Sequence, residues 1–244
     1  MKITFRSVDE FEGWYRFPSF IEEVIASQSG KRVCEIGAGA NPALGPDAIR
    51  RHELQFRAVD EVEGELVKSG IEQTSVCDVC KPGAGVPGAP YDLIFSRMTA
   101  EHFRYPRHAY LNMLQALVPG GLSVHCFATL YALPFIVNRV IPDRLTNFLW
   151  DHFAPRDRER HDKFKAYYSH CRGPIESQRQ FFQSLGYEIV EYRGYFGHNY
   201  YEFRFPFLHR LHRRTANLLL KIPVALFTTY ATVILRRPST TKSN

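Results

Sequence analysis

One short stretch constrains the fold of this chain more than any other: an apolar run that passes at once into a glycine-rich turn. Residues 33–36 form the run, which contains the acid Glu35, and residues 37–42 form the turn, with glycines at Gly37 and Gly39. A nearly continuous apolar run is typical of a parallel strand that is covered on both faces. Glycine lacks a Cβ and adopts positive φ, so the backbone of this turn can approach a ligand closely. The stretch predicts a strand with a nucleotide-like ligand at its carboxyl end.

Two later strand patterns also end in acids. Residues 56–61 form a pattern that ends in Asp60 and Glu61, and residues 73–79 form another that carries Asp78 near its end. Asp60 stands 21 residues after Gly39. In dinucleotide-binding folds, an acid at about this distance accepts hydrogen bonds from ribose hydroxyls. These acids support the prediction of a nucleotide-like ligand.

Strand and helix patterns alternate along most of the chain. Helix patterns begin near Pro18, cover residues 108–118 and end again at Leu185, and further strand patterns cover residues 91–97, 121–127, 187–192 and 229–235. This alternation is typical of a doubly wound, mostly parallel sheet. A chain of 244 residues has the size of one domain. We therefore expect a single α/β, Rossmann-like domain over residues 1–238 and a disordered tail over residues 239–244.

The composition and the cysteines exclude several classes of protein. A hydrophobic share of 45% and a charged share of 23% are ordinary for a globular domain and exclude wholesale disorder. The amino terminus has no apolar run and no small-residue cleavage site, so we expect a cytoplasmic protein. The five cysteines suit reduced, buried thiols better than a disulfide framework. Cys77 and Cys80 have the spacing of half a zinc ribbon, but no second pair completes it, so we expect no metal site.

Five ordered motifs resemble those of the class I S-adenosylmethionine-dependent methyltransferase superfamily. Residues 35–39 resemble its first motif, Asp60 resembles the acid that ends its second strand, and Asp78 resembles the acid after its third. Residues 91–96 resemble the fourth-strand motif, and residues 117–121 resemble the turn before the fifth strand. The resemblance covers about residues 30–128 and the last two strands. It implies a seven-stranded sheet, mostly parallel with an antiparallel last strand.

The resemblance also implies S-adenosyl-L-methionine as the cofactor and a set of residues that bind it. Gly37 and Gly39 would pass under its methionine and ribose parts, and Asp60 would take the ribose hydroxyls. Glu61 would flank the adenine, although a solvated strand end explains this residue as well, and Asp78 would accept from the adenine amino group. The full set that the resemblance implies is Glu35, Gly37, Ala38, Gly39, Asp60, Glu61, Asp78, Val79 and Ser96.

The glycine turn departs from a dinucleotide-binding loop at one position. The third glycine of the G-x-G-x-x-G pattern is missing, and Pro42 stands in its place. A pyrophosphate needs close approach over the start of the helix, which this turn serves less well. S-adenosylmethionine has no pyrophosphate, so the departure favours the methyltransferase over a nicotinamide-dependent enzyme.

A base for methyl transfer to a hydroxyl is expected just after the fourth strand. His102 follows Glu101 there, at the carboxyl edge of the sheet where ligands bind in such folds. An imidazole with an ordinary pKa near 6.5 suits the task. The alternative is that Glu101 and His102 only cap or orient the following helix.

Two segments interrupt the alternation, residues 128–172 and residues 198–227. The first begins with an apolar stretch over residues 130–142, and the second mixes arginines with leucines over residues 208–220. Such a mixture is typical of helices at a membrane interface. Residues 216–235 carry one charge and are long enough to span a bilayer, but Lys221 and Pro223 lie inside them and their second half suits the last strand. We therefore expect a lid that faces the acceptor or the membrane, with a peripheral contact at the inner face of the membrane.

The expected reaction is methyl transfer to a small-molecule acceptor, most plausibly at oxygen, such as an apolar or lipid-linked glycan. One alternative is an RNA methyltransferase, which the basic cluster in residues 204–214 favours. No Asn- or Asp-Pro-Pro-aromatic sequence follows the fourth strand, so we do not expect a nucleobase acceptor. Another alternative is a cofactor-binding protein without turnover, attached to a membrane or to a partner. The pattern leaves the oligomeric state open.

Overall fold

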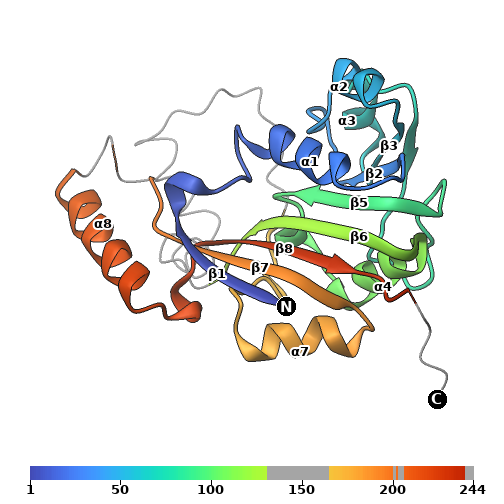
Figure 1. Ribbon diagram of the computed structural model, residues 1–244. Coiled ribbons are helices and arrows are strands. Elements are labelled where there is room, and N and C mark those ends of the chain that lie inside the picture. The colour runs from blue at the N-terminus through green and yellow to red at the C-terminus, as the bar shows by residue number, and fades with distance from the viewer. Residues whose placement is uncertain (131–164, 200–201, 203–205, 240–244) are drawn as a thin grey trace.

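An eight-stranded sheet runs through the computed structural model, which describes residues 1–130, 165–199, 202 and 206–239 (Figure 1). The order across the sheet is β1-β7-β8-β6-β5-β2-β3-β4. The strands are β1 (Lys2–Ser7), β2 (Arg32–Ile36), β3 (Gln55–Asp60), β4 (Thr74–Val76), β5 (Tyr91–Arg97), β6 (Leu117–Ala128), β7 (Glu188–Phe196) and β8 (Tyr230–Arg236). β8 runs antiparallel to both of its neighbours, and the other pairs are parallel. The expected α/β sheet with an antiparallel last strand is confirmed.

The number of strands differs from the expected seven, because β1 adds an eighth at the edge. β1 pairs with β7 in parallel, from Lys2 opposite Glu191 to Ser7 opposite Phe196. The ring of Phe5 stacks on Phe196 with 5.5 Å between centroids. A short edge strand that carries charges has a weak sequence signal, because its partners lie far away in the chain.

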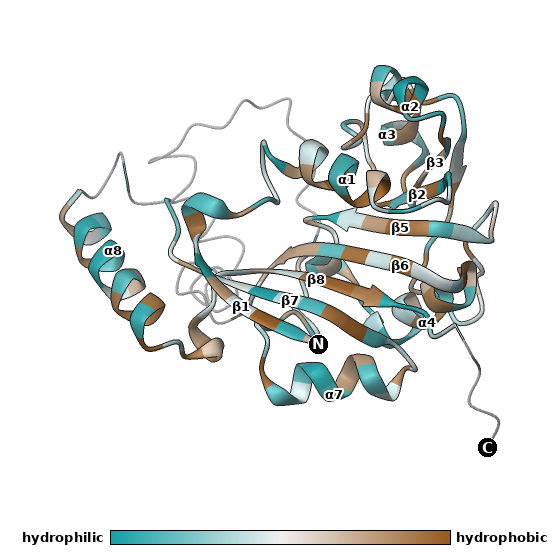
Figure 2. Ribbon diagram, viewed as in Figure 1, coloured by the Kyte–Doolittle hydropathy of each residue, from teal (hydrophilic) through white to brown (hydrophobic). Residues whose placement is uncertain are grey.

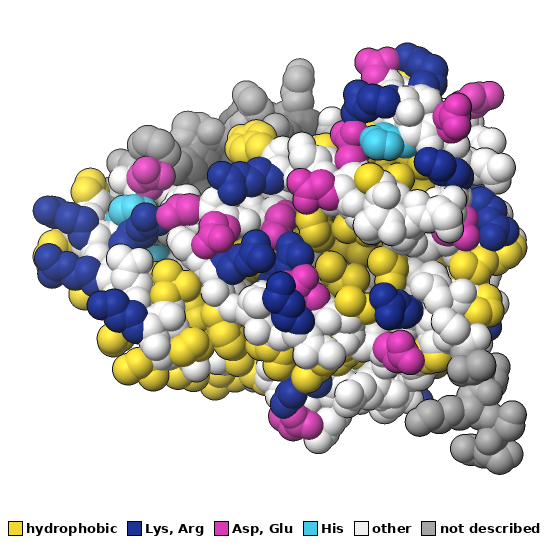
Figure 3. Space-filling model, in the orientation of Figure 1, with side chains coloured by type: hydrophobic (Ala, Val, Ile, Leu, Met, Phe, Trp, Pro, Cys, Tyr) yellow, Lys and Arg dark blue, Asp and Glu magenta, His cyan; other side chains and the backbone are white. Residues whose placement is uncertain are grey.

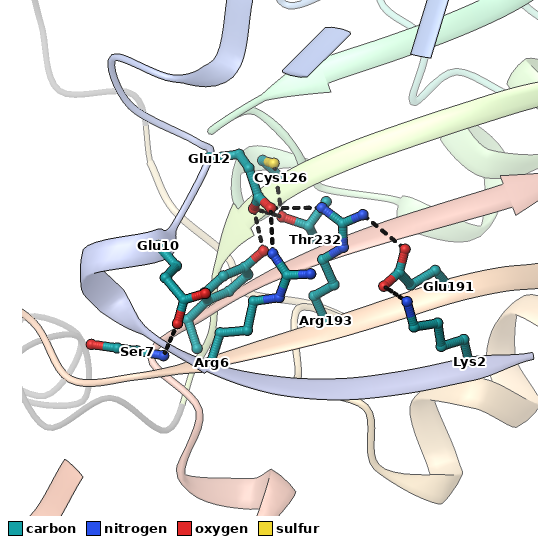
Figure 4. Close-up of polar contacts among 10 residues, drawn as sticks. Lys2, Arg6, Ser7, Glu10, Glu12, Cys126, Glu191, Arg193 and Thr232 are labelled. Carbon is teal, nitrogen blue, oxygen red and sulfur yellow. Dashed lines mark hydrogen bonds and ion pairs between the residues drawn. The ribbon is translucent and has the colours of Figure 1, made fainter. Parts of the chain in front are cut away.

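A network of charges joins β1 to β7 and to the segment after β1 (Figure 4). Glu12 is buried and accepts hydrogen bonds from Arg193 Nη1 at 2.6 Å and from the hydroxyl of Tyr195. Arg6 lies 3.6 Å from the same carboxylate, and Arg193 Nη2 donates to Glu191 at 2.8 Å. Burial alone would lower the pKa of Arg193, but its hydrogen bond with Glu191 and the charge of Glu12 raise it. The arginine therefore stays charged between two acids, which fixes the edge of the sheet.

Helices cover both faces of the sheet and form two apolar layers with it (Figures 1 and 2). One layer packs α1 (Phe17–Ala26), α2 (Pro46–Arg51) and α3 (Glu63–Lys68) against the sheet, and the other packs α4 (Pro106–Ala116) and α7 (Glu176–Ser184). Neighbouring residues on the central strand β5 divide between the layers, because side chains alternate across a strand. Leu93 and Phe95 pack with α1, and Ile94 packs with α4. The expected helices near Pro18 and over residues 108–118 are confirmed within a few residues.

The remaining elements of the described residues lie around the edge of the sheet at which β2, β3, β5 and β7 end. They are three 3₁₀ turns, η1 (Val8–Glu10), η2 (Ala100–His102) and η3 (Ala225–Phe227), and the helix α8 (Pro206–Lys221). α8 belongs to the second expected insert and stands out from the body of the molecule (Figure 1). Most of the first expected insert, including the apolar stretch after Leu130, lies outside the described residues. The expected tail lies outside them too, except for Ser239.

Candidate active site

A pocket open to solvent, of about 800 Å³, lies where β2, β3, β4 and β5 end. Ligands bind outside the carboxyl ends of the strands in open α/β sheets. Its lining comes from the turn after β2, the ends of β3 and β4, and η2 after β5. The residues that line it are Ile36, Gly37, Gly39, Asp60, Glu61, Glu65, Cys77, Asp78, Val79, Cys80, Met98, Thr99, His102 and Phe103.

The turn after β2 needs glycine at Gly37. Its φ is +70°, in the left-handed region, and a Cβ there would lie 2.2 Å from the Cγ2 atom of Thr99. The amides of Gly37 and Ala38 donate to the carbonyl oxygen of Val59 at 2.8 and 3.2 Å. The backbone therefore folds over the end of β3 and forms the floor of the pocket, where a side chain would not fit.

Asp60 ties the glycine turn to the end of β3. Its Oδ2 atom accepts from the amide of Gly39 at 2.9 Å, and its Oδ1 atom accepts from the amide of Val62 at 3.0 Å. Each carboxylate oxygen has two lone pairs, so both oxygens can accept one further hydrogen bond each. The carboxylate is thus held in place while it keeps the capacity to bind two adjacent hydroxyls.

The pocket is acidic. Four carboxyl side chains line it, those of Asp60, Glu61, Glu65 and Asp78. Desolvation and the negative charges of Asp78 and Asp60 raise the pKa of Glu61 above its usual value. Among the residues that the structure describes, neither lysine nor arginine contributes to the lining. Such a site favours a ligand that is cationic or uncharged over one that carries phosphates.

Three of the residues expected to bind the cofactor, Glu35, Ala38 and Ser96, do not line the pocket. The Glu35 carboxylate is fully buried and accepts from the amide of Ala43, with its two oxygens at 2.8 and 3.1 Å from the nitrogen. Burial raises the pKa of Glu35 to about 8. The hydroxyl of Ser96 hydrogen-bonds His125 Nδ1 at 2.8 Å inside the sheet. Glu35 lies on the opposite face of β2 from Ile36, which lines the pocket, because side chains alternate across a strand, so Glu35 supports the turn from below.

His102 lies in the pocket, and its ring is held by the last part of the first insert. Its Nδ1 atom is 3.2 Å from the carbonyl oxygen of Lys165. Desolvation lowers the pKa of His102, so the ring is neutral at pH 7. A carbonyl oxygen can only accept, so Nδ1 carries the proton and the lone pair is on Nε2. The ring therefore has the protonation state of a base.

Glu101, the other expected catalytic residue, does not line the pocket. Its side chain is buried, and Oε2 has no hydrogen-bond partner among the described residues. Burial raises the pKa of Glu101 to about 8, so the side chain is uncharged at pH 7. Its carbonyl oxygen accepts from the amides of Tyr167 and Tyr168 at 2.8 and 2.9 Å. The residue joins η2 to the end of the first insert, which matches a positioning role better than a base.

Several lining residues were not predicted. Met98 adopts a φ of +51°, and its amide donates to the Cys126 carbonyl oxygen at 2.8 Å, which turns the chain sharply after β5. Thr99 and Phe103 enter the pocket through this turn. A turn of this shape leaves no glycine or proline signal in the sequence. Cys77 and Cys80 flank the predicted Asp78 and could have been inferred from it.

The comparisons with known proteins rest on structure alone. No protein-family model matches the chain, and neither does any curated protein. An S-adenosylmethionine-dependent methyltransferase from Clostridium acetobutylicum aligns with a TM-score of 0.57 and 12% identity, over 94% of this chain and 92% of that one. The [4+2]-cyclase SpnF aligns with a TM-score of 0.54 and 14% identity, over 95% of this chain and 86% of that one.

A longer protein, phosphoethanolamine N-methyltransferase 2 from Haemonchus contortus in complex with S-adenosyl-L-methionine, aligns with a TM-score of 0.56 and 14% identity. The alignment covers 92% of this chain and 53% of that one, so this chain spans about half the length of that enzyme. The antiparallel β8 between β6 and β7 is the arrangement that the sequence resemblance implied. This chain has the fold of the class I S-adenosylmethionine-dependent methyltransferases.

Proposed function

We propose that this protein is an S-adenosylmethionine-dependent methyltransferase. The observation that carries the proposal is the pocket, in which a glycine turn, two acids at neighbouring strand ends and a neutral histidine come together in this fold. A fold alone does not define a reaction, so the chemistry of these residues is the main support.

The residues present fit this cofactor. Asp60 can accept from both ribose hydroxyls, and the side-chain-free backbone of Gly37 and Gly39 lines the pocket where the part that joins ribose to methionine would lie. The acidic lining suits a sulfonium cation and disfavours the pyrophosphate of a dinucleotide. When bound, S-adenosylmethionine supplies an activated methyl group on sulfur, so the protein mainly aligns the acceptor.

On the acceptor side we assign His102 as the base and a hydroxyl as the acceptor group. Nε2 of the neutral ring would take the hydroxyl proton as the oxygen bonds to the methyl carbon and the bond from that carbon to the sulfonium sulfur breaks. Met98 and Phe103 give this part of the pocket an apolar lining. The acceptor in this proposal is a small molecule with an apolar portion, such as a lipid-linked glycan.

A second candidate is a protein that binds the cofactor without methyl transfer. One protein that shares the fold is named a [4+2]-cyclase, so the reactions hosted by this fold are diverse. In this case, the cofactor would bind and no methyl group would leave it.

Turnover separates the two candidates. Purified protein is incubated with S-adenosylmethionine and a cell extract, and S-adenosylhomocysteine release is measured along with extract metabolites that gain one methyl group. We expect release that depends on the extract and is largely lost in Asp60→Asn. Asp47→Asn is the matched control, because the Asp47 side chain is exposed on α2, and it keeps wild-type turnover. Cofactor binding without any release in the extract would contradict methyl transfer and favour the second candidate.

A further inference from the structure

α8 presents an apolar ridge on the side that faces away from the protein. Phe207, Leu211 and Leu218 are 75%, 52% and 59% exposed, and Ile222, just after the helix, is 67% exposed. Their spacings of four, seven and four residues place them on one side of a helix. Monomeric soluble proteins rarely leave a row of large apolar side chains in water without a use for it.

The opposite side of α8 is fixed to the body of the protein. Ala216 is buried, and a Cβ on Gly197 would lie 3.4 Å from its Cβ, so the helix packs closely against the end of β7. Arg213 Nη1 binds the Asp9 carboxylate at 2.7 and 2.9 Å. Because these contacts hold the inner side, the ridge is a stable outward surface rather than a helix displaced from the core.

The apolar surface continues into the segment that follows the helix. Val224, Leu226 and Phe227 are 41%, 39% and 54% exposed, at and beside η3. Figure 3 shows hydrophobic side chains along the lower left of the molecule, below the basic ones of the region around α8. We call the exposed apolar side chains of residues 207–227 the α8 surface.

Positive charges accompany the α8 surface. Arg210, Arg214 and Lys221 are exposed on α8, at helical positions beside the ridge. From residue 203 to residue 244 the sequence contains eight lysines and arginines and no aspartate or glutamate. The acids near the helix belong to other segments, and Asp9 among them is already paired with Arg213. The surface therefore combines exposed apolar side chains with exposed positive charge.

An anionic lipid surface matches this combination better than other partners do. Arg214 and Lys221 lie beside the ridge, so a second copy of the chain packed on the ridge would bring like charges together. Long basic side chains can instead bury their stems in a lipid interface and keep their charged ends at the headgroups. Nucleic acid would engage the charges but would leave Phe207, Leu211 and Leu218 in water. Within the described residues, no helix is both long enough and apolar enough to cross a bilayer.

We propose that the α8 surface binds the face of an anionic lipid bilayer, with α8 lying parallel to it. This inference goes beyond the proposed methyltransferase and does not depend on it. α8 follows β7, and β7 ends at the same edge of the sheet as β2, β3 and β5, where the pocket opens. Docking through α8 would hold this edge near the membrane, where an amphipathic acceptor is concentrated.

Flotation of the full chain with vesicles tests the proposal without an activity readout. The probes are vesicles of phosphatidylcholine alone and of phosphatidylcholine with phosphatidylglycerol, each at low and at high salt. We expect binding to the anionic vesicles only, and weaker binding at high salt because salt screens the charges. Each basic residue near the surface contributes about fivefold in affinity. The triple substitution Arg210→Glu, Arg214→Glu and Lys221→Glu should therefore lower binding by at least about 100-fold.

Two control variants match the charge and the apolar contributions. The charge control makes the same change in net charge at exposed positions away from α8, with Lys31→Glu, Arg50→Glu and Arg236→Glu. It should still bind strongly. Leu218→Ser with Ile222→Ser should lower binding by about tenfold or more. The control is Val67→Ser with Val76→Ser, at side chains that are 79% and 54% exposed away from α8, and it should not lower binding. Thermal unfolding of each variant checks that these surface changes keep the fold.

Several results would overturn the membrane contact. The proposal is wrong if the wild-type protein does not bind anionic vesicles at low salt. Equal losses in the α8 and control charge variants would reduce the effect to net charge. An unchanged Leu218→Ser, Ile222→Ser variant would remove the apolar part of the contact. A dimer that this variant dissociates, without vesicle binding by the wild type, would assign the α8 surface to a second copy of the chain.

Discussion

At the scale of single residues, the site depends on positions where only one side chain fits. Gly37 must be glycine for two independent reasons, its positive φ and the contact that a Cβ would make with Thr99. The role proposed for His102 as a base depends on the protonation of its ring. Gly37 gives a prediction about the shape of the pocket, and His102 gives one about its chemistry.

Replacing Gly37 with alanine should damage both folding and cofactor binding. Positive φ costs a non-glycine residue about 1 kcal/mol, and the Thr99 side chain must also move away from the new methyl group. We expect a loss of about 2 kcal/mol in the free energy of unfolding, measured by urea denaturation. Gly64→Ala is the control, because nothing lies within 4 Å of its Cβ position in α3, and it should be neutral or stabilising. Equal effects of the two substitutions would contradict the assigned strain.

The pH dependence of turnover tests His102. Its pKa is lowered from 6.5 by burial, and a base must be deprotonated to act. We therefore expect kcat/KM to be constant near neutral pH and to fall only as the pH drops below 6.5. His102→Gln should remove this acid limb and lower kcat by about 100-fold or more. His52→Gln, which removes a contact with Glu22 outside the pocket, should leave the profile unchanged. A profile that His102→Gln does not alter would exclude this residue as the base.

At the scale of elements, the strands with a local pattern could be predicted, including the edge strand β4, and the other edge strand, β1, could not. β2, β3, β5, β6, β7 and β8 carry apolar runs, which are a local signal. β1 is stabilised by Arg6 and Lys2 through Glu12 and Glu191, and Glu191 lies far along the chain, so no local pattern reports it. Glu35 and Ser96 were expected at the pocket because their motifs are there. Their interior hydrogen bonds, from the Ala43 amide to Glu35 and between Ser96 and His125, depend on packing that the motifs do not report.

The charge network of β1 and β7 gives a prediction at this scale. Glu12→Ala leaves Arg193 buried beside one acid instead of two, and removing one partner of a buried ion pair costs about 3–5 kcal/mol. We expect a loss in this range in urea denaturation, with recovery of part of it when Arg193→Met is added. Asp47→Ala, which breaks an exposed pair with Arg50, should cost less than about 1 kcal/mol. A cost for Glu12→Ala as small as that of this control would show that the network does not hold the edge.

At the scale of the whole molecule, the sheet brings to one edge the pocket residues that are spread over about seventy residues of the sequence. The glycine turn, Asp60, Asp78 and His102 each follow a different strand, and parallel strands bring their carboxyl ends together. This much follows from the order of the motifs. The acidity of the pocket and the separation of Glu101 from His102 depend on packing, and only the structure reveals them. The α8 surface lies at the same edge, so the pocket and the proposed membrane contact would be on one side of the protein.

Calorimetric titration of the cofactor tests the central claim most directly. We expect the wild type to bind S-adenosylmethionine and S-adenosylhomocysteine but not NAD. Asp60→Asn should weaken this binding by about 10- to 100-fold, the value of hydrogen bonds to a charged group, and Asp47→Asn should not. Binding of NAD in place of S-adenosylmethionine, or equal affinity in the wild type and Asp60→Asn, would contradict the site described here.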